Sequence, residues 1–175
     1  NSDKFVVMGD SAGANLAAVT STALVHMNII KASVLIYPVI THGYSHEFSY
    51  TKTLYANAPI LTAQKMEWYT QRYFNTPEEI STHPLACLVC PENLHPSGDE
   101  SSNNLFPRTH ILTAEVDPLR AEGEYYYQLL HNIHHDKITY HQYNNTIHGF
   151  FGIPFLPHGI TAVNDVCTLL HQYFE

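Results

Sequence analysis

The sequence predicts an α/β fold, in which a mostly parallel sheet is flanked by helices. Three observations favour this class. Short apolar runs alternate with longer amphipathic stretches, the joins between them are short, and one long polar interruption at residues 41–104 follows the second apolar run. With 175 residues, the chain is long enough to bury a sizeable core, and this length predicts one domain over residues 1–175.

Composition and charge exclude several classes of protein. Hydrophobic residues make up 45% of the chain and charged residues 14%, which is typical of a globular protein. The chain has 8 Lys and Arg residues against 16 Asp and Glu residues, a net charge of −8, and no Lys/Arg cluster. Nucleic acid and anionic membranes are therefore not expected partners. No apolar run approaches the ~20 residues of a membrane span, so we expect no stable membrane insertion.

The cysteines give no sign of a secreted protein. Three cysteines are too few, and odd in number, for the disulfide framework of a small secreted domain, and we expect a cytoplasmic protein. The C-x-x-C spacing of Cys87 and Cys90 has no second such pair and does not follow a strand-to-helix turn. We interpret it as two buried or half-buried thiols, and not as a redox or metal site.

Residues 4–40 are expected to form a strand, a helix and a second strand. "KFVVMG", which Gly9 ends, is typical of a strand buried on both faces. A helix is expected from Ala12 to about Met27, with apolar positions at spacings of three and four: Leu16, Val19, Ala23 and Met27. "ASVLIYPVI", residues 32–40, predicts a second buried strand. Strand, helix and strand with short joins indicate parallel strands with a right-handed crossover.

Residues 41–104 are polar and rich in Tyr and His, and we interpret them as an insertion over the sheet. The helical patch in this segment is "LTAQKMEWYTQRYF", with Thr62 as the expected N-cap and Met66, Tyr69 and Tyr73 on one face. Residues 90–104 are typical of a loop. The alternation then resumes with strand 109–117, helix 118–133 with Pro118 in its first turn, strand 137–145, loop 147–154 and helix 158–174.

One motif between the first strand and the first helix predicts a nucleophile. Gly9-Asp10-Ser11-Ala12-Gly13 matches G-x-S-x-G, in which the serine lies on a sharp strand-to-helix turn with its Oγ exposed. The flanking glycines are expected to leave room where side chains would collide. The N–H of Ala12 lies at the helix N-terminus and can donate to an oxyanion. A glycine-rich loop with a capping serine is the alternative interpretation.

A nucleophilic serine needs a base, and the base needs an acid that orients it. In folds of this kind the order along the chain is Ser, then Asp or Glu, then His. Asp117 ends an expected strand, and His148 follows in a loop 31 residues later (148 − 117). Glu115 is the second choice for the acid, because it lies inside the strand.

The chain has 13 histidines, and several compete with the expected base. His42 and His158 also begin His-Gly dipeptides, but His42 precedes the expected acid and His158 lies closer to the last helix. His131, His134 and His135 have a spacing that could bind a metal from one helix. No carboxylate or fourth ligand completes that pattern, so we predict a solvated helix end and no metal site.

Four segments together resemble the hormone-sensitive-lipase-like branch of the α/β-hydrolases: "VVMGDSAGANLA", "ASVLIYPV", "HILTAEVDPLRAEGEYYYQLL" and "ITYHQYNNTIHGFF". They cover most of the chain outside residues 41–104 and follow the family's order. The resemblance implies a carboxylic ester hydrolase that needs no cofactor and acts on short- to medium-chain acyl esters. Ser11 would be the nucleophile, His148 the base and Asp117 the orienting acid, and residues 41–104 would contribute to the substrate pocket.

The sequence also departs from the family pattern. Ala14 stands where the family has a second glycine, and Ala121 where an acidic residue often occurs. The family's upstream His-Gly-Gly motif, which supplies further oxyanion N–H groups, does not occur here. We therefore expect the C-terminal portion of an α/β-hydrolase domain, with an upstream half or a second copy of the chain as partner besides a small ester. The alternative is a non-catalytic remnant or binding module.

Overall fold

Four parallel strands form the sheet, in the order β1-β2-β3-β4. The computed structural model describes residues 5–42, 49–83, 88–89, 94 and 105–174. Its strands are β1 (Phe5–Asp10), β2 (Ile30–Ile36), β3 (Arg108–Val116) and β4 (Ile138–Ile147). Its α-helices are α1 (Ala12–Ala23), α2 (Ser49–Leu54), α3 (Ala63–Tyr73), α4 (Pro77–Thr82), α6 (Arg120–His134) and α7 (Pro157–Phe174). This architecture confirms the predicted α/β class.

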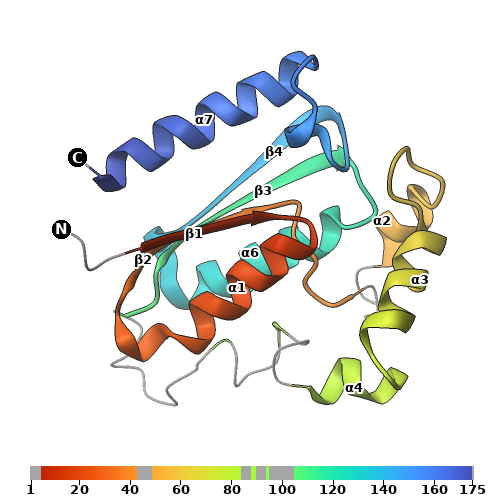
Figure 1. Cartoon of the computed structure of the whole chain (residues 1–175), viewed down its shortest axis with the longest axis horizontal. Coiled ribbons are helices and arrows are strands. Elements are labelled where there is room, and N and C mark those ends of the chain that lie inside the picture. The colour runs from red at the N-terminus through yellow and green to blue at the C-terminus, as the bar shows by residue number, and fades with distance from the viewer. Residues whose placement is uncertain (1–4, 43–48, 84–87, 90–93, 95–104, 175) are drawn as a thin grey trace.

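The helices cover the sheet on both sides. Helices α1 and α6 lie on one face and α7 on the other, while α3 lies beyond the carboxyl ends of the strands (Figure 1). In a parallel sheet with helical crossovers, ligand sites form at these carboxyl ends. The fold therefore places the predicted nucleophile, which follows β1, at the carboxyl ends of the strands, on the side of the sheet where α3 lies.

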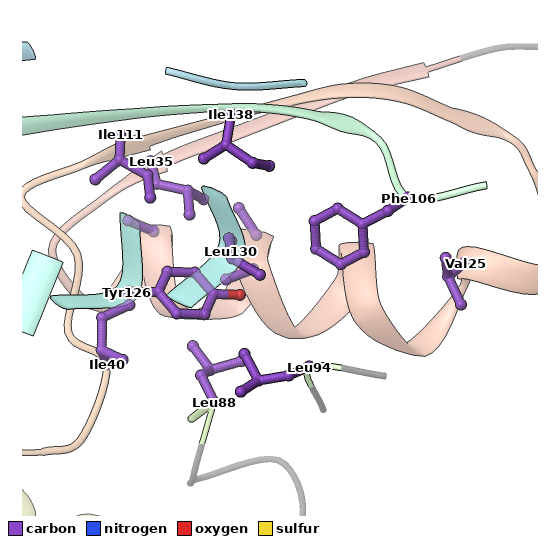
Figure 2. Packing of buried hydrophobic residues seen from close by; sticks show 13 residues of the cluster. Val25, Leu35, Ile40, Leu88, Leu94, Phe106, Ile111, Tyr126, Leu130 and Ile138 are labelled. Carbon is purple, nitrogen blue, oxygen red and sulfur yellow. The ribbon is translucent and has the colours of Figure 1, made fainter. Parts of the chain in front are cut away.

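Alternate residues along the central strands divide the core into two layers. Leu35 and Ile111 point toward α1 and α6, where they pack with Tyr126 and Leu130 (Figure 2). Neighbouring strand residues point to the opposite face and pack against α7: Val34, Ile36, Leu112 and Ala114. Because successive side chains of a strand point to opposite faces, a strand covered by helices on both sides carries mostly apolar side chains on both faces.

Two expectations for the N-terminal unit are wrong in detail. Of the predicted apolar positions, Leu16 is 57% exposed and Met27 59% exposed, and only Val19 packs against the core. The buried face is made of small residues instead: Ala14, Asn15, Ala17, Ala18, Ser21 and Thr22. Small side chains let the helix lie close to the sheet. The α-helix also ends at Ala23 and continues as a 3₁₀ turn over Val25–Met27.

Strand β1 is not buried on both faces as predicted, because it forms the edge of the described sheet. Phe5 is 57% exposed and Met8 is 44% exposed. Strand β2 lies inside the sheet and is buried almost throughout, but it ends at Ile36 and not at residue 40. The backbone of Tyr37 has a φ of 36°, which ends the extended conformation.

In the region of residues 41–104, the structure bears out the expected helix α3. The Thr62 side chain caps it by accepting a hydrogen bond from the Lys65 N–H at 3.1 Å. The predicted loop at residues 90–104 lies outside the described residues except for Leu94, and so do Cys87 and Cys90. No α-helix in the described part of the chain is both long and apolar enough to cross a bilayer.

The C-terminal end of α7 is held to the sheet through His110 of β3. The His110 Nε2 lies 2.6 Å from the Tyr173 hydroxyl, and its Nδ1 lies 2.6 Å from Thr139 Oγ1. Burial, with a smaller contribution from the charge of Arg108, lowers the pKa of His110 from 6.5 to about 4. The folded protein therefore keeps this imidazole neutral at pH values where the unfolded chain protonates it.

The difference between the pKa of His110 in the folded chain and in the unfolded chain predicts that the protein becomes less stable as the pH falls. Between about pH 6.5 and pH 4 the unfolded chain binds a proton at His110 that the folded chain does not, so the free energy of unfolding decreases as the pH falls. We expect His110 to contribute about 1–2 kcal/mol to that decrease. Urea unfolding of the wild type and of His110→Gln across this range measures it. An equal pH dependence in both proteins would contradict the assignment.

Candidate functional site

The turn between β1 and α1 holds Ser11 in a strained backbone conformation. Ser11 has φ 54° and ψ −120°, a combination that non-glycine residues rarely adopt. Its N–H donates to the Ile36 carbonyl at 2.9 Å, and its carbonyl accepts from the N–H groups of Ala14 and Asn15 at 3.1 and 3.2 Å. These bonds fix the serine at the point where a strand becomes a helix, which is the predicted position for a nucleophile.

The two flanking glycines are not equivalent. A Cβ on Gly9 would lie 2.3 Å from the Gly13 carbonyl oxygen, so no side chain fits there. A Cβ on Gly13 would meet nothing within 4 Å. The expected steric need for glycine therefore holds at Gly9 and is wrong at Gly13. The close approach at Gly9 is what lets the first turn of α1 fold back over the end of β1.

The structure brings the three predicted residues together. His148 Nε2 lies 3.0 Å from Ser11 Oγ, and His148 Nδ1 lies 2.7 Å from Asp117 Oδ2. The acid follows the end of β3 and the histidine follows the end of β4. Asp117 is fully buried and His148 nearly so. The second Asp117 oxygen accepts a hydrogen bond from the Leu119 N–H at 2.8 Å, so both carboxylate oxygens have partners.

Of the competing residues, Glu115 and His158 do not line the pocket beside Ser11, whereas His42 does. The Glu115 carboxylate accepts from the Asn145 N–H at 2.6 Å and stabilises the end of β4. His158 lies in the exposed first turn of α7. Within the described residues, no three His, Cys, Asp or Glu side chains are grouped as metal ligands.

Tyr37 was not predicted from sequence, although it contacts the site directly. Its ring centroid lies 4.7 Å from that of His148, and its hydroxyl donates to Asp10 Oδ2 at 3.3 Å. Burial and the neighbouring Asp10 carboxylate raise its pKa well above the ordinary value, so the phenol stays protonated. Tyr37 therefore supports the face of the imidazole. The sequence carried no signal for this role, because Tyr37 follows an apolar strand.

Glu122 is a second residue that the sequence did not reveal. It lies in the first turn of α6 and is only 2% exposed. Its Oε2 accepts from the N–H groups of Ile40 and Thr41 at 2.9 and 2.7 Å. This buried carboxylate fixes the chain after β2, which forms one wall of the pocket beside the serine.

A pocket of about 570 Å³ opens beside Ser11 and His148. Its walls are mostly apolar and include Leu16, Val39, Ile60, Leu61, Met66 and Leu119. Tyr69 and Tyr73, predicted on one face of α3 with Met66, also line it. His42 lies in the wall as well, and burial lowers its pKa from 6.5 to about 4, so it is neutral near pH 7.

Comparison with known proteins identifies a family and several relatives. A family model described as alpha/beta hydrolase fold matches residues 1–152. An arylesterase of Saccharolobus solfataricus is 28% identical over 173 residues, which are 99% of this chain and 52% of that protein. A hyperthermophilic esterase from Pyrobaculum calidifontis superimposes with a TM-score of 0.79 at 34% identity, covering 95% of this chain and 52% of that one.

A structure of fungal esterases from Rhizomucor miehei gives a TM-score of 0.81 at 30% identity, covering 99% of this chain and 51% of that one. The chain thus spans about half the length of each of these three relatives.

The unequal glycines predict unequal effects of the same substitution. Gly9→Ala places a methyl group against backbone that cannot move aside, and we expect it to destabilise the fold by about 3 kcal/mol. Gly13→Ala adds the same methyl group in open space within a helix, so we expect no loss of stability or a gain of up to about 1 kcal/mol. Urea unfolding of the two variants tests this, and similar losses in both would contradict it.

Proposed function

The chain belongs to the alpha/beta hydrolase fold family, and on this premise we propose that it carries the catalytic residues of a carboxylic ester hydrolase. The observation that carries the proposal is the hydrogen-bonded series Ser11–His148–Asp117 beside an apolar pocket. The arylesterase and esterase relatives support the same reaction class.

In the proposed mechanism, Asp117 sets the tautomer of His148. The Nδ1–H donates to the carboxylate, which leaves the Nε2 lone pair free to accept the proton of Ser11. Ser11 Oγ attacks the ester carbonyl carbon as His148 takes that proton. The buried carboxylate then stabilises the imidazolium, and the Leu119 N–H keeps the carboxylate oriented.

The tetrahedral oxyanion needs donors that are already in place. Ala12 is the first residue of α1, so its N–H has no carbonyl partner within the helix and is available to the oxyanion. The intermediate collapses when His148 returns the proton to the leaving alcohol, which leaves an acyl-enzyme on Ser11. Water then attacks the acyl carbon with His148 as base, and the acid product leaves as Ser11 regains its proton.

Substrates of this site are proposed to be short- to medium-chain acyl esters. The pocket volume is in the range of sites for small ligands, and its apolar walls suit the hydrocarbon part of an ester. Leu61, Met66 and the two tyrosines come from residues 41–104, which supports the proposal that this segment contributes to the substrate pocket.

Substitution of the two acids near β3 tests the proposed roles. Asp117→Asn removes the negative charge beside His148 and favours the wrong tautomer of the imidazole, so we expect kcat for p-nitrophenyl butyrate to fall about 10³–10⁴-fold. Ser11→Ala should abolish turnover. Glu115→Gln is the matched control, because the Glu115 carboxylate accepts from the Asn145 N–H and does not contact His148. This substitution should leave kcat within about twofold of the wild-type value. Comparable losses in Asp117→Asn and Glu115→Gln would contradict the assignment.

A second candidate function is a non-catalytic ester-binding module. It is favoured by the outer edge of β1, where no further strand pairs in the described part of the chain and two apolar side chains of that strand, Phe5 and Met8, are exposed. Such an edge is open to pairing with an upstream half or with a second copy of the chain. On this candidate, Ser11 has too few oxyanion donors without a paired segment.

A p-nitrophenyl alkylphosphonate separates the two candidates, because it labels an activated serine without requiring turnover. The esterase proposal predicts stoichiometric labelling of Ser11 together with steady hydrolysis of p-nitrophenyl butyrate. Labelling without hydrolysis supports the second candidate, and absence of both excludes the first.

A further inference from the structure

One side chain in the pocket wall carries a permanent charge, and it is a cation. Arg72 lies in the last turn of α3 and lines the pocket, and no Asp or Glu is among the described residues that line it. The other basic residues there are histidines, and burial keeps His42 neutral near pH 7 by lowering its pKa to about 4. A mostly apolar pocket therefore carries a positive charge.

Arg72 is held in place without a counter-charge. Its Cζ lies 3.7 Å from the centroid of the Trp68 ring, and its Nη1 donates to the Trp68 carbonyl at 3.3 Å. Among the described residues, no ion pair joins Arg72 to a carboxylate. Stacking on the indole restricts the guanidinium while its other N–H groups remain available to a ligand.

We propose that Arg72 binds an anionic group, of the carboxylate class, that lies at the end of the ester substrate remote from the scissile bond. This inference rests on the proposed esterase function. Met66 is buried in the pocket, and Arg72 is exposed six residues later (72 − 66), about 9 Å along the helix axis. The ester would lie at Ser11, an apolar portion against Met66, and the anion at the rim.

The net negative charge of the chain strengthens the argument that Arg72 binds an anion. At −8 the molecule as a whole repels anions, so an anionic substrate would need a specific contact to bind. A guanidinium meets that need, because it binds a carboxylate through two parallel hydrogen bonds.

Matched pairs of esters test the proposal. One arm compares p-nitrophenyl half-esters of succinic, adipic and suberic acid with p-nitrophenyl alkanoates of the same chain lengths. A second arm compares 4-carboxyphenyl butyrate with phenyl butyrate and so places the anion on the alcohol part. In at least one arm, Arg72→Gln should lower the ratio of kcat/KM for the charged ester to that for the neutral ester by about tenfold. The arm that responds shows which part of the substrate carries the anion.

Lys65→Gln is the control for overall charge. Lys65 lies on the same helix, and its Nζ donates to the Ile60 carbonyl, but it is not a pocket residue. Lys65→Gln removes one positive charge, as Arg72→Gln does, and should leave the ratio of kcat/KM for the charged ester to that for the neutral ester within about twofold of the wild-type ratio. Rising ionic strength should weaken the preference in the wild type and not in Arg72→Gln. Equal ratios in the wild type and Arg72→Gln in both arms would overturn the proposal.

A binding measurement separates this inference from the esterase proposal. Trp68 is the chain's single tryptophan and lies against Arg72, so its fluorescence reports an anion bound there. Suberic acid monoamide should give a saturable change in the wild type and in Ser11→Ala, and octanamide should not. Loss of the change in Arg72→Gln supports the anion site even if no ester is hydrolysed. A change that persists in Arg72→Gln, or that is absent from the wild type, contradicts it.

Discussion

The strained turn at Ser11 is the constraint on which the site depends. Its backbone cannot relax, because its N–H is bonded to β2 and its carbonyl accepts from the first turn of α1. That turn can approach β1 only because Gly9 lacks a side chain. The fold thus offsets the cost of one unfavourable conformation with several hydrogen bonds, and the result is a serine whose Oγ faces His148.

The parallel sheet explains how residues distant in sequence meet. Ser11, Asp117 and His148 each follow the carboxyl end of a strand, and the carboxyl ends of parallel strands all lie on the same side of the sheet. What the sheet does not provide is orientation. Asp117 is oriented by the Leu119 N–H, and the face of His148 is supported by Tyr37. The parallel strands therefore bring the three residues close together, and contacts with neighbouring residues fix the orientation of their side chains.

The elements could be predicted because they follow from local signals, namely apolar runs and glycine at a turn. The positions of the three central residues were predicted from the order Ser, Asp, His along the chain. The errors arose where the answer depends on neighbours in space. The exposure of β1 depends on which strand lies beside it, and the buried face of α1 depends on how closely the helix approaches the sheet. Glu122 was invisible for the same reason, because a helical glutamate gives no hint that its partners lie some 80 residues away.

The placement of the acidic groups determines the electrostatics of the pocket. Asp117 and Glu122 are buried, and each accepts hydrogen bonds that offset its desolvation, so neither presents its charge to the pocket wall. Both carboxylates hold other groups in place, Asp117 the His148 ring and Glu122 the chain after β2. Apart from Ser11 and His148, the described pocket wall is mostly apolar and includes neutral His42 and Arg72. An acidic protein can thus hold a cation in its pocket wall, because these two buried carboxylates are bonded to other groups of the site.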